Sequence, residues 1–378
     1  MASMSEELVI VGARATGTSI ALVEAAMRRG MGVTILLESG VELDRNVFPK
    51  QTEIFNVDTR ESAVISWIQE RFSHQAAKLY VTTAHDLYAK LAANVAASLG
   101  CLGPDAECVT LSISKSAQKR ILEEASIPTS PYAVIDYQNR DQTSSLVSAL
   151  AIPVVVKPSE GSASNGVRLC HSIKDAVEHV ALLFESDGGL QEGQVVVESF
   201  LSGHEYCVEF FDGVYVGSMR KLKSSGLRFV ERGYTAELDL QDITLERMIA
   251  VCGAAVAAAG LTWGPVHLDC IVSHDVPHIV ELNPRIAGSF ICDIVRDAYH
   301  FDPVEALLDK LQGQEIRLPN AFKPKRYARV DFFLDEDSPS WDLAEGGNVC
   351  TGPLTMRYGP LRIPSRERRA FVYVHGTR

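Results

Sequence analysis

Two short apolar segments with acidic residues at their ends constrain the fold of this chain more than any other feature. Cys270–Val272 and His278–Leu282 are rich in Val and Ile, and a polar turn separates them. Short β-branched runs joined by a turn are typical of a β-hairpin. Pairing of the two strands would bring Asp269 close to Glu281 and Asn283. Such oxygen ligands suit Mg²⁺, so the pattern predicts either a magnesium site or an acidic hairpin end facing solvent.

The size and composition of the chain are those of a soluble protein with several lobes. Its 378 residues exceed one typical hydrophobic core, which predicts about two to four lobes. Hydrophobic residues make up 46% and charged residues 22% of the sequence, as in ordinary globular proteins. The net charge of −12 argues against a nucleic-acid-binding surface, which requires a basic patch.

The cysteine pattern and the N-terminal sequence predict a cytoplasmic protein. The eight cysteines are scattered and form no Cys-X-X-Cys pair, which is typical of reduced thiols. The N-terminal sequence MASMSEEL lacks the basic and apolar regions of a signal peptide. The longest apolar-rich stretch, Ile249–Gly260, is too short to span a membrane, so we expect no membrane association.

The N-terminal region predicts a Rossmann-like lobe. A buried strand at Leu8–Gly12, a helix at Ser19–Arg29 and a strand at Gly32–Leu37 form the βαβ opening of a parallel sheet. The turn between the first strand and the helix has Arg14 where a dinucleotide fingerprint needs glycine. We therefore expect a structural lobe and disfavour an NAD-dependent oxidoreductase.

The remainder of the chain predicts alternating helices and strands. Two strand-like segments in the tail, Arg329–Phe333 and Ala370–Val374, predict a small C-terminal β lobe. The other predicted strands are Pro153–Lys157, Val167–Cys170, Gln194–Glu198 and Glu205–Phe211, and the other predicted helices are Thr83–Leu99, Ser116–Ala125, Lys174–Glu185 and Leu245–Ala259.

Lys157 stands at the end of a predicted strand, directly before the small-residue loop Ser159–Gly166. Loops of this kind can bring backbone N–H groups up to phosphate oxygens, and a lysine at their base adds a fixed positive charge. The P-loop triplets GKS and GKT are absent. The pattern predicts a phosphate-binding loop, with a loop rich in Ser and Gly for flexibility alone as the alternative.

The order of these features closely resembles the ATP-grasp superfamily. The features are Lys115 at a helix start, Lys157 with its loop, the pattern ExxLxGxE at Glu198–Glu205, and the segment from Asp269 to Arg285. The resemblance covers roughly residues 80–310. It implies an α/β, multi-lobed ATP-grasp fold with an N-terminal Rossmann-like domain (1–112), a small lid subdomain (113–195), a large subdomain with the metal site (196–315) and a C-terminal β lobe (316–378).

The resemblance also implies how a nucleotide is bound. Lys115 and Lys157 would contact the ATP phosphates, and the loop with Ser162, Ser164 and Gly166 would close over them. The adenosine would be held at the ExxLxGxE segment. Glu198 would accept from the adenine amino group, Phe200 and Leu201 would line the hinge, and Glu205 would bind the ribose hydroxyls.

At the opposite end of the nucleotide, the resemblance implies a metal centre and a catalytic arginine. Asp269, Glu281 and Asn283 would hold one or two Mg²⁺ ions, with Mn²⁺ as a substitute. Arg285 would face the transferring phosphate, since its planar fork suits phosphate and carboxylate oxygens. His267 is interpreted either as a basic residue at the γ-phosphate or as a packing histidine.

The segment Arg220–Tyr234 resembles the FVExGH segment of L-amino-acid ligases, with tyrosine in place of the usual histidine. Within it, Glu231 would neutralise the ammonium group of an amino acid, and Lys223 or Arg228 would bind phosphate or carboxylate. A solvent-exposed hairpin with alternating charges is the alternative. The turn with Gly288 and Ser289 resembles the loop that holds the carboxylate of the acceptor.

These features predict an ATP-dependent carboxylate–amine ligase that acts on amino acids and small carboxylic acids through an acylphosphate, releasing ADP and phosphate. One alternative is a purine-pathway or carbamoyl-phosphate-like enzyme of the same superfamily. Another is a nucleotide-binding regulator without turnover. The identity of the acid and of the amine stays open. Dimers are usual among similar enzymes, so a homodimer is the assembly to test.

Overall fold

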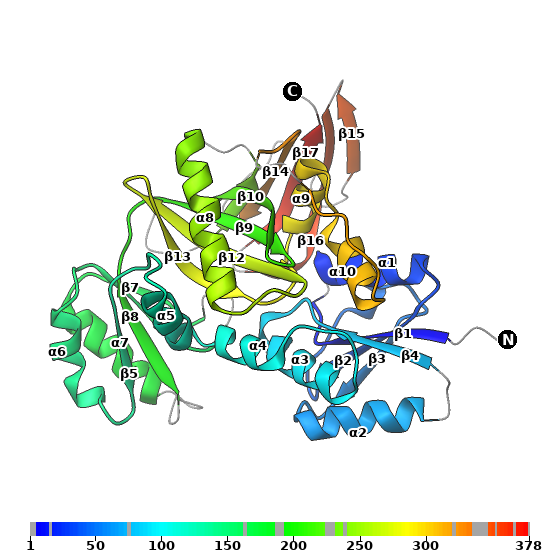
Figure 1. Ribbon diagram of the computed structural model, residues 1–378, viewed down its shortest axis with the longest axis horizontal. Coiled ribbons are helices and arrows are strands. Elements are labelled where there is room, and N and C mark those ends of the chain that lie inside the picture. The colour runs from blue at the N-terminus through cyan, green and yellow to red at the C-terminus, as the bar shows by residue number, and fades with distance from the viewer. Residues whose placement is uncertain are drawn as a thin grey trace.

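The computed structural model describes residues 5–14, 17–73, 77–161, 165–185, 193–223, 231–236, 240–319, 323–334, 347–351, 354–365 and 368–376. Figure 1 shows a four-stranded sheet at the lower right, a second four-stranded sheet at the lower left, and a nine-stranded sheet above them. The N-terminal sheet is parallel, whereas the other two are antiparallel. Because helices pack on these sheets, the structure confirms the predicted α/β class.

The N-terminal sheet has the strand order β3-β2-β1-β4, and it confirms the predicted βαβ opening. Leu8, Val9, Ile10 and Val11 are fully buried. Burial on both faces is typical of a parallel sheet and explains why this run is continuously apolar. The elements are β1 (Ser5–Val11), α1 (Thr18–Arg28), β2 (Gly32–Glu38), β3 (Glu53–Val57), α2 (Glu61–Phe72), β4 (Ala77–Thr82) and α3 (Ala89–Ser98), with the short 3₁₀ helix η1 (Arg45–Val47).

The prediction of one continuous helix from Thr83 to Leu99 was wrong at its start. A short 3₁₀ helix, η2 (Asp86–Tyr88), precedes α3, which begins at Ala89. The hydroxyl of Thr83 accepts from the backbone N–H of His85 at 3.0 Å. Such a side-chain turn competes with helix formation, and here it directs the chain so that Asp86 reaches Arg285.

The second sheet is antiparallel, with the order β5-β8-β6-β7. Its buried core joins valines of β6 and β8 to Ala176 and Val180 of the covering helix α7. The elements are α4 (Ala106–Ile113), α5 (Lys115–Glu124), β5 (Tyr132–Asp136), η3 (Arg140–Gln142), α6 (Thr143–Ser148), β6 (Val154–Pro158), β7 (Arg168–Cys170), α7 (Ile173–Glu185) and β8 (Gln194–Ser199).

The nine-stranded sheet carries the predicted hairpin and has the order β13-β12-β9-β10-β11-β14-β17-β16-β15. Helix α8 crosses β9, β12 and β13 (Figure 1), and its buried residues recur at helical spacing. The elements are β9 (His204–Phe211), β10 (Val214–Lys223), β11 (Glu231–Thr235), α8 (Asp242–Ala258), β12 (Pro265–Ser273), β13 (Val276–Asn283), α9 (Ile291–Tyr299), α10 (Pro303–Leu311), β14 (Tyr327–Leu334), β15 (Gly347–Thr351), β16 (Leu354–Ser365) and β17 (Arg368–Gly376).

The strands of the predicted C-terminal lobe continue the large sheet. Strand β14 pairs with β11, where Val330 stands opposite Tyr234, and β17 then pairs with β14. The tail strands are therefore hydrogen-bonded to the sheet that carries the predicted metal ligands. The four predicted domain ranges stay a prediction.

Charged side chains at the C-terminal end of α1 and on α10 link the N-terminal lobe to the large sheet region, and the two regions also share an apolar core. Arg29 pairs with Glu305 at 2.7 Å and with Asp309 at 2.6 Å. No helix in the described part of the chain is long and apolar enough to cross a membrane.

Candidate functional site

The predicted metal ligands lie on one face of two neighbouring strands, β12 and β13. Asp269 of β12 stands opposite Cys207 of β9 on one side and opposite Glu281 of β13 on the other. Two residues before Asp269 on the same strand, His267 stands opposite Asn283. Directly opposite residues of antiparallel strands project from the same face. The strand register therefore brings the three predicted ligands together, and α8 packs against the other face.

The donor set of this hairpin fits Mg²⁺. Two carboxylates and an amide oxygen are hard oxygen donors on adjacent strands. The two carboxylates attract cationic groups: Lys221 Nζ lies 2.8 Å from Asp269 Oδ2, and Lys115 Nζ lies 2.9 Å from Glu281 Oε1. A divalent cation at this hairpin would therefore replace these ammonium groups, and the metal assignment of Asp269, Glu281 and Asn283 stays a prediction.

Lys221 is the centre of an ion-pair cluster that the sequence reasoning missed. Its ammonium lies 2.8 Å from Glu205, 2.8 Å from Asp269 and 3.4 Å from Glu231. Although burial alone would lower it, the charges of Asp269 and Glu205 hold the pKa of Lys221 well above its usual value. Lys221 thus contacts both Glu205, which is predicted to bind the ribose, and Asp269, which is predicted to bind the metal.

The side-chain alternation of a strand offered a signal for Lys221. Lys221 and Lys223 are two residues apart on β10, so they project from the same face. Lys223, which the sequence reasoning named, also pairs with Glu205. Its side chain is 32% exposed, whereas that of Lys221 is 6% exposed. The buried lysine of the two is therefore the one that organises the acids.

Glu198 and Lys157 form a second buried cluster with Lys119, which the sequence reasoning also missed. Each carboxylate oxygen of Glu198 contacts one lysine at 2.6 Å, Oε1 facing Lys157 and Oε2 facing Lys119. The hydroxyl of Ser130 donates to Oε2 at 2.7 Å. Burial acts to raise the pKa of Glu198, but the two lysines outweigh it and lower the pKa well below its usual range. The predicted contact of Glu198 with an adenine amino group stays a prediction.

Lys115 connects the loop after β6 to the β12–β13 hairpin. It begins α5, whose N-cap is Ser114. Its ammonium donates to the carbonyl oxygen of Gly161 at 3.1 Å and pairs with Glu281. A single cation therefore links the predicted phosphate-binding loop and a predicted metal ligand.

The far end of this loop is anchored at Gly166. The Nε2 atom of the buried His179 on α7 lies 2.9 Å from the Gly166 carbonyl oxygen. Gly166 has φ of 71°, a conformation that favours glycine. The predicted loop residues Ser162 and Ser164 lie outside the described residues.

The predicted adenine hinge follows β8. Phe200 is 39% exposed and its backbone N–H donates to the carbonyl oxygen of Pro153 at 2.9 Å. Leu201 is half-buried. This places an apolar edge beside the Glu198 cluster, as an adenine ring requires, and the binding roles of Phe200 and Leu201 stay predictions.

Arg285 is held by an acid from the N-terminal lobe. Its guanidinium pairs with Asp86 of η2, and its Nη1 donates to the carbonyl oxygen of Ile286 at 2.7 Å. Burial opposes ionisation of Asp86, but the charge of Arg285 outweighs it and lowers the pKa of this carboxyl. Asp86 is a residue that the sequence reasoning missed, because it lies in a segment predicted to be helical.

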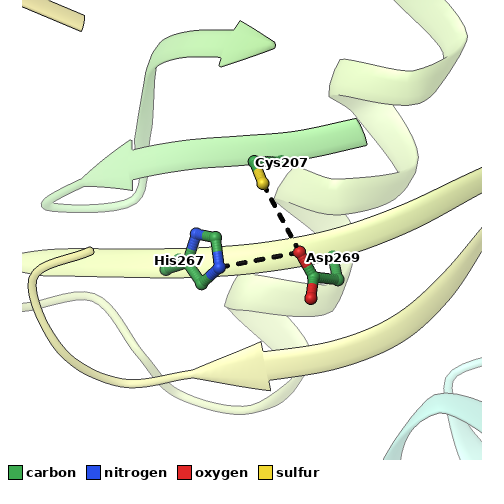
Figure 2. Close-up of side chains that lie close together, drawn as sticks. All are labelled: Cys207, His267 and Asp269. Atoms are coloured by element: carbon green, nitrogen blue, oxygen red, sulfur yellow. Dashed lines mark hydrogen bonds and ion pairs between the residues drawn. The ribbon is translucent and has the colours of Figure 1, made fainter. Parts of the chain in front are cut away.

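His267 lies in the protein interior next to Asp269, and its role at the γ-phosphate stays a prediction. Its Nδ1 is hydrogen-bonded to Glu209 at 2.6 Å in the protein interior, as in a packing histidine. Its Nε2 lies 3.6 Å from Oδ1 of Asp269, a predicted metal ligand on the same strand (Figure 2). Burial would lower the pKa of His267, but the charge of Glu209 raises it. Glu209 was also missed from the sequence.

Comparison with known proteins identifies the domain. Residues 150–293 match the ATP-grasp domain family. This chain contains an ATP-grasp domain. An L-amino acid ligase from Bacillus licheniformis has the same fold, with a TM-score of 0.74, 19% identity, and coverage of 100% of this chain and 94% of the ligase.

Two sequence relatives extend the comparison beyond the ATP-grasp domain. The protein y4rH of Sinorhizobium fredii is 26% identical over 340 residues, which are 90% of this chain and 70% of that protein. A phosphoribosylamine–glycine ligase of Lactococcus lactis is 25% identical over 236 residues, which are 58% of this chain and 56% of that ligase. The chain therefore spans little more than half of that ligase.

The predicted substrate segment borders the ATP-grasp site. Glu231 faces Lys221 with one oxygen and accepts from the hydroxyl of Tyr234 at 2.7 Å with the other. Arg228 lies outside the described residues. The position of Glu231 beside the lysine cluster shows that this part of the segment is half-buried, unlike a hairpin exposed to solvent.

The turn with Gly288 and Ser289 follows the ATP-grasp hairpin and meets the start of α1. The hydroxyl of Thr18 donates to the carbonyl oxygen of Ala287 at 2.6 Å. A side chain at Gly17 would collide with the backbone of Ser289. The N-terminus of α1 therefore lies against the turn predicted to hold a carboxylate.

Proposed function

We propose that this chain is an ATP-dependent carboxylate–amine ligase that joins a carboxylic acid or amino acid to an amino acid. The observation that carries the proposal is the placement of Lys115. This cation contacts both the loop after β6 and Glu281 of the hairpin. A polyphosphate bound between loop and hairpin would therefore meet a lysine and a metal-binding acid at once, which phosphoryl transfer requires.

The proposed chemistry activates a carboxylate, which is a poor electrophile because oxide is a poor leaving group. The carboxylate oxygen attacks the γ-phosphorus of ATP, and the bond to the β-phosphate oxygen breaks, which gives an acylphosphate and ADP. The amine then attacks the acyl carbon and loses a proton as phosphate leaves. Catalysis of such steps depends mainly on positioning and charge neutralisation.

The described residues provide these charges. Lys115 and Lys157 neutralise phosphate oxygens from two sides, and Arg285 faces the transferring phosphoryl group with its fork of N–H donors. Mg²⁺, one ion or two, would neutralise further phosphate charge at Asp269, Glu281 and Asn283 when bound. Lys157 and Arg285 have buried side chains with paired acids, so both are already oriented.

The remaining assignments concern the nucleotide and its enclosure. Glu198, Phe200 and Leu201 hold the adenine, and Glu205 holds the ribose. The loop of Ser162, Ser164 and Gly166 closes over the phosphates and excludes water, because an acylphosphate hydrolyses readily. His179 supports this role by fixing the loop at Gly166.

The proposed amino-acid substrate binds between the charged residues of β10–β11 and the turn at α1. Glu231 neutralises its ammonium group, and Lys223 binds phosphate or carboxylate. Gly288 and Ser289 hold its carboxylate with backbone N–H groups. The N-terminus of α1 beside this turn favours a negative charge there.

The test is a screen for ADP and phosphate release over pairs of carboxylic acids and amines, including amino-acid pairs. Glycine with phosphoribosylamine belongs in the screen because of the similarity to the Lactococcus ligase. Release of ADP and phosphate that requires both an acid and an amine supports a ligase. The pair of substrates that gives turnover then identifies the reaction. Tight ATP binding without turnover on any pair would replace the proposal with a nucleotide-binding regulator.

Arg285→Ala is expected to abolish ligation while ATP binding survives, because the arginine faces the reacting groups and not the adenosine. Arg247→Ala, at an exposed arginine of α8, is the matched control and keeps wild-type turnover. Initial rates of ADP release and equilibrium ATP binding measure the two effects. Ligation at the wild-type rate by Arg285→Ala would refute the role of this residue.

A further inference from the structure

Cys207, His267 and Asp269 converge on the polar face of the large sheet (Figure 2). The potential ligand atoms of the three side chains lie within 4.8 Å of one another. We propose that they form a binding site for a thiophilic divalent cation such as Zn²⁺, with a ligand set different from that of Mg²⁺ but with Asp269 in common.

The geometry is close to that of a tetrahedral zinc site. The Sγ atom of Cys207 and the Nε2 atom of His267 each lie 3.6 Å from Asp269 Oδ1. Zinc bonds of about 2.0–2.3 Å at tetrahedral angles separate ligand atoms by about 3.3–3.8 Å. Two of the three ligand–ligand distances therefore already have the required length.

The carboxylate of Glu209 orients His267 for metal binding. Glu209 is buried and hydrogen-bonded to His267 Nδ1 at 2.6 Å. Carboxylate–histidine pairs of this kind fix the ring and leave Nε2 to the metal. In this structure Nε2 faces Asp269, on the side of Cys207.

The two oxygens of Asp269 have separate partners. Lys221 pairs with Oδ2 at 2.8 Å, whereas Oδ1 faces Cys207 and His267. A cation bound at Oδ1 would therefore keep the Lys221 contact. Thiolate and imidazole ligands favour Zn²⁺ over Mg²⁺, which prefers oxygen donors. Three protein ligands leave a fourth position for water, and the thiol proton departs to solvent when the metal binds.

One consequence rests on the proposed function. Because Asp269 belongs to both ligand sets, Zn²⁺ at this site would prevent Asp269 from holding Mg²⁺. Zn²⁺ would then inhibit ligation in competition with Mg²⁺, and Cys207→Ser would relieve this inhibition while Mg²⁺-dependent turnover continued.

The binding test uses Co²⁺ as a spectroscopic probe on the full chain after chelator treatment and dialysis. One equivalent of Co²⁺ is expected to give a thiolate-to-cobalt charge-transfer band in the near ultraviolet, displaced by Zn²⁺. Cys207→Ser is expected to lose the band. Cys270→Ser keeps it, because the neighbouring Cys270 is also buried but contacts Cys252 of α8. No band in the wild type, or a band that survives Cys207→Ser, would overturn the proposal.

Two further measurements are independent of how Cys207→Ser folds. Glu209→Gln is expected to weaken Co²⁺ binding about 10–100-fold, as for other carboxylates behind metal-bound histidines, and an unchanged affinity would count against the site. In zinc-soaked crystals of the wild type, an anomalous peak should lie among Sγ, Nε2 and Oδ1, and a peak elsewhere would exclude this site. These readouts need no turnover, so failure of the ligase proposal is distinguishable from failure of the metal proposal.

Discussion

Lys221→Met is expected to destabilise the protein strongly, because the lysine ammonium balances three carboxylates in a buried place. The side chains of Lys221, Glu205 and Asp269 are 6%, 10% and 14% exposed. Methionine keeps the apolar stem and removes the charge. Loss of one partner of a buried ion pair costs about 3–5 kcal/mol, since the remaining charges are left uncompensated.

The expected change in melting temperature follows from the length of the chain. Unfolding entropy is about 2.1 cal/mol/K per residue, so the 378 residues contribute about 0.8 kcal/mol/K if they unfold as one unit. A loss of about 3–5 kcal/mol then lowers the melting temperature by about 4–6 °C. Differential scanning calorimetry in metal-free buffer measures this shift.

Lys223→Met is the matched control, since its pair with Glu205 is more exposed to solvent. Exposed pairs contribute about 0–1 kcal/mol, so this variant should melt within about 1 °C of the wild type. Adding Mg²⁺ should stabilise Lys221→Met more than the wild type, because the ammonium no longer competes at Asp269. Equal shifts for the two lysine variants, or a larger Mg²⁺ effect on the wild type, would refute the reasoning.

Three other outcomes are expected. Glu198→Gln leaves Lys157 and Lys119 without their shared acid and should destabilise the protein at neutral pH. The pKa of Glu198 is depressed in the folded state, so the wild type should exceed this variant in unfolding free energy by its full amount above the usual glutamate pKa of about 4.3. This stability difference should narrow as the pH falls toward the folded-state pKa. A stability difference in urea melts that stayed constant over this pH range would contradict the prediction. Lys115→Met should weaken ATP binding about 10–100-fold by loss of a charge-assisted contact, measured by calorimetric titration, whereas Arg120→Met on the exposed side of the same helix should bind ATP normally. Removal of divalent ions with a chelator should abolish ADP release and Mg²⁺ should restore it, and turnover that persists in chelator would exclude the predicted metal role of Asp269 and Glu281.

The hairpin and the pairing of its two acids could be predicted from the sequence because they depend on local rules. The β-branched runs and the turn between them fix the pairing, and this pairing puts Asp269 opposite Glu281. Strand β12 nevertheless begins at Pro265, five positions before the predicted start. His267 and Asp269 interrupt the apolar run in sequence, but in a strand they occupy the face opposite the core.

The counter-charges could not be predicted in the same way, since they come from distant parts of the chain. Asp86 and Arg285 are separated by 199 positions, and no local periodicity relates them. Lys119 lies on a helix rich in charged residues and resembles a solvated lysine until the fold buries it against Glu198. Burial of a charged side chain is a property of tertiary packing, so a sequence pattern indicates the acids of a site more readily than the bases that balance them.

The arrangement of these pairs has a consequence for ligand binding. Each predicted carboxylate ligand already contacts a lysine, as the pairs of Glu198, Glu205, Asp269 and Glu281 show. A metal ion that approaches such a carboxylate, or a phosphate that approaches such a lysine, therefore replaces an existing ion pair. The free energy gained on binding is the new interaction minus the lost ion pair, so it is smaller than the new interaction alone. When Mg²⁺ and ATP bind together, however, the released lysines and the released acids each meet a new partner of opposite charge. This exchange favours joint binding of Mg²⁺ and ATP over separate binding. Titrations should therefore show that Mg²⁺ increases the affinity for ATP, and that this increase is larger than at a site whose acids and lysines are not paired with each other.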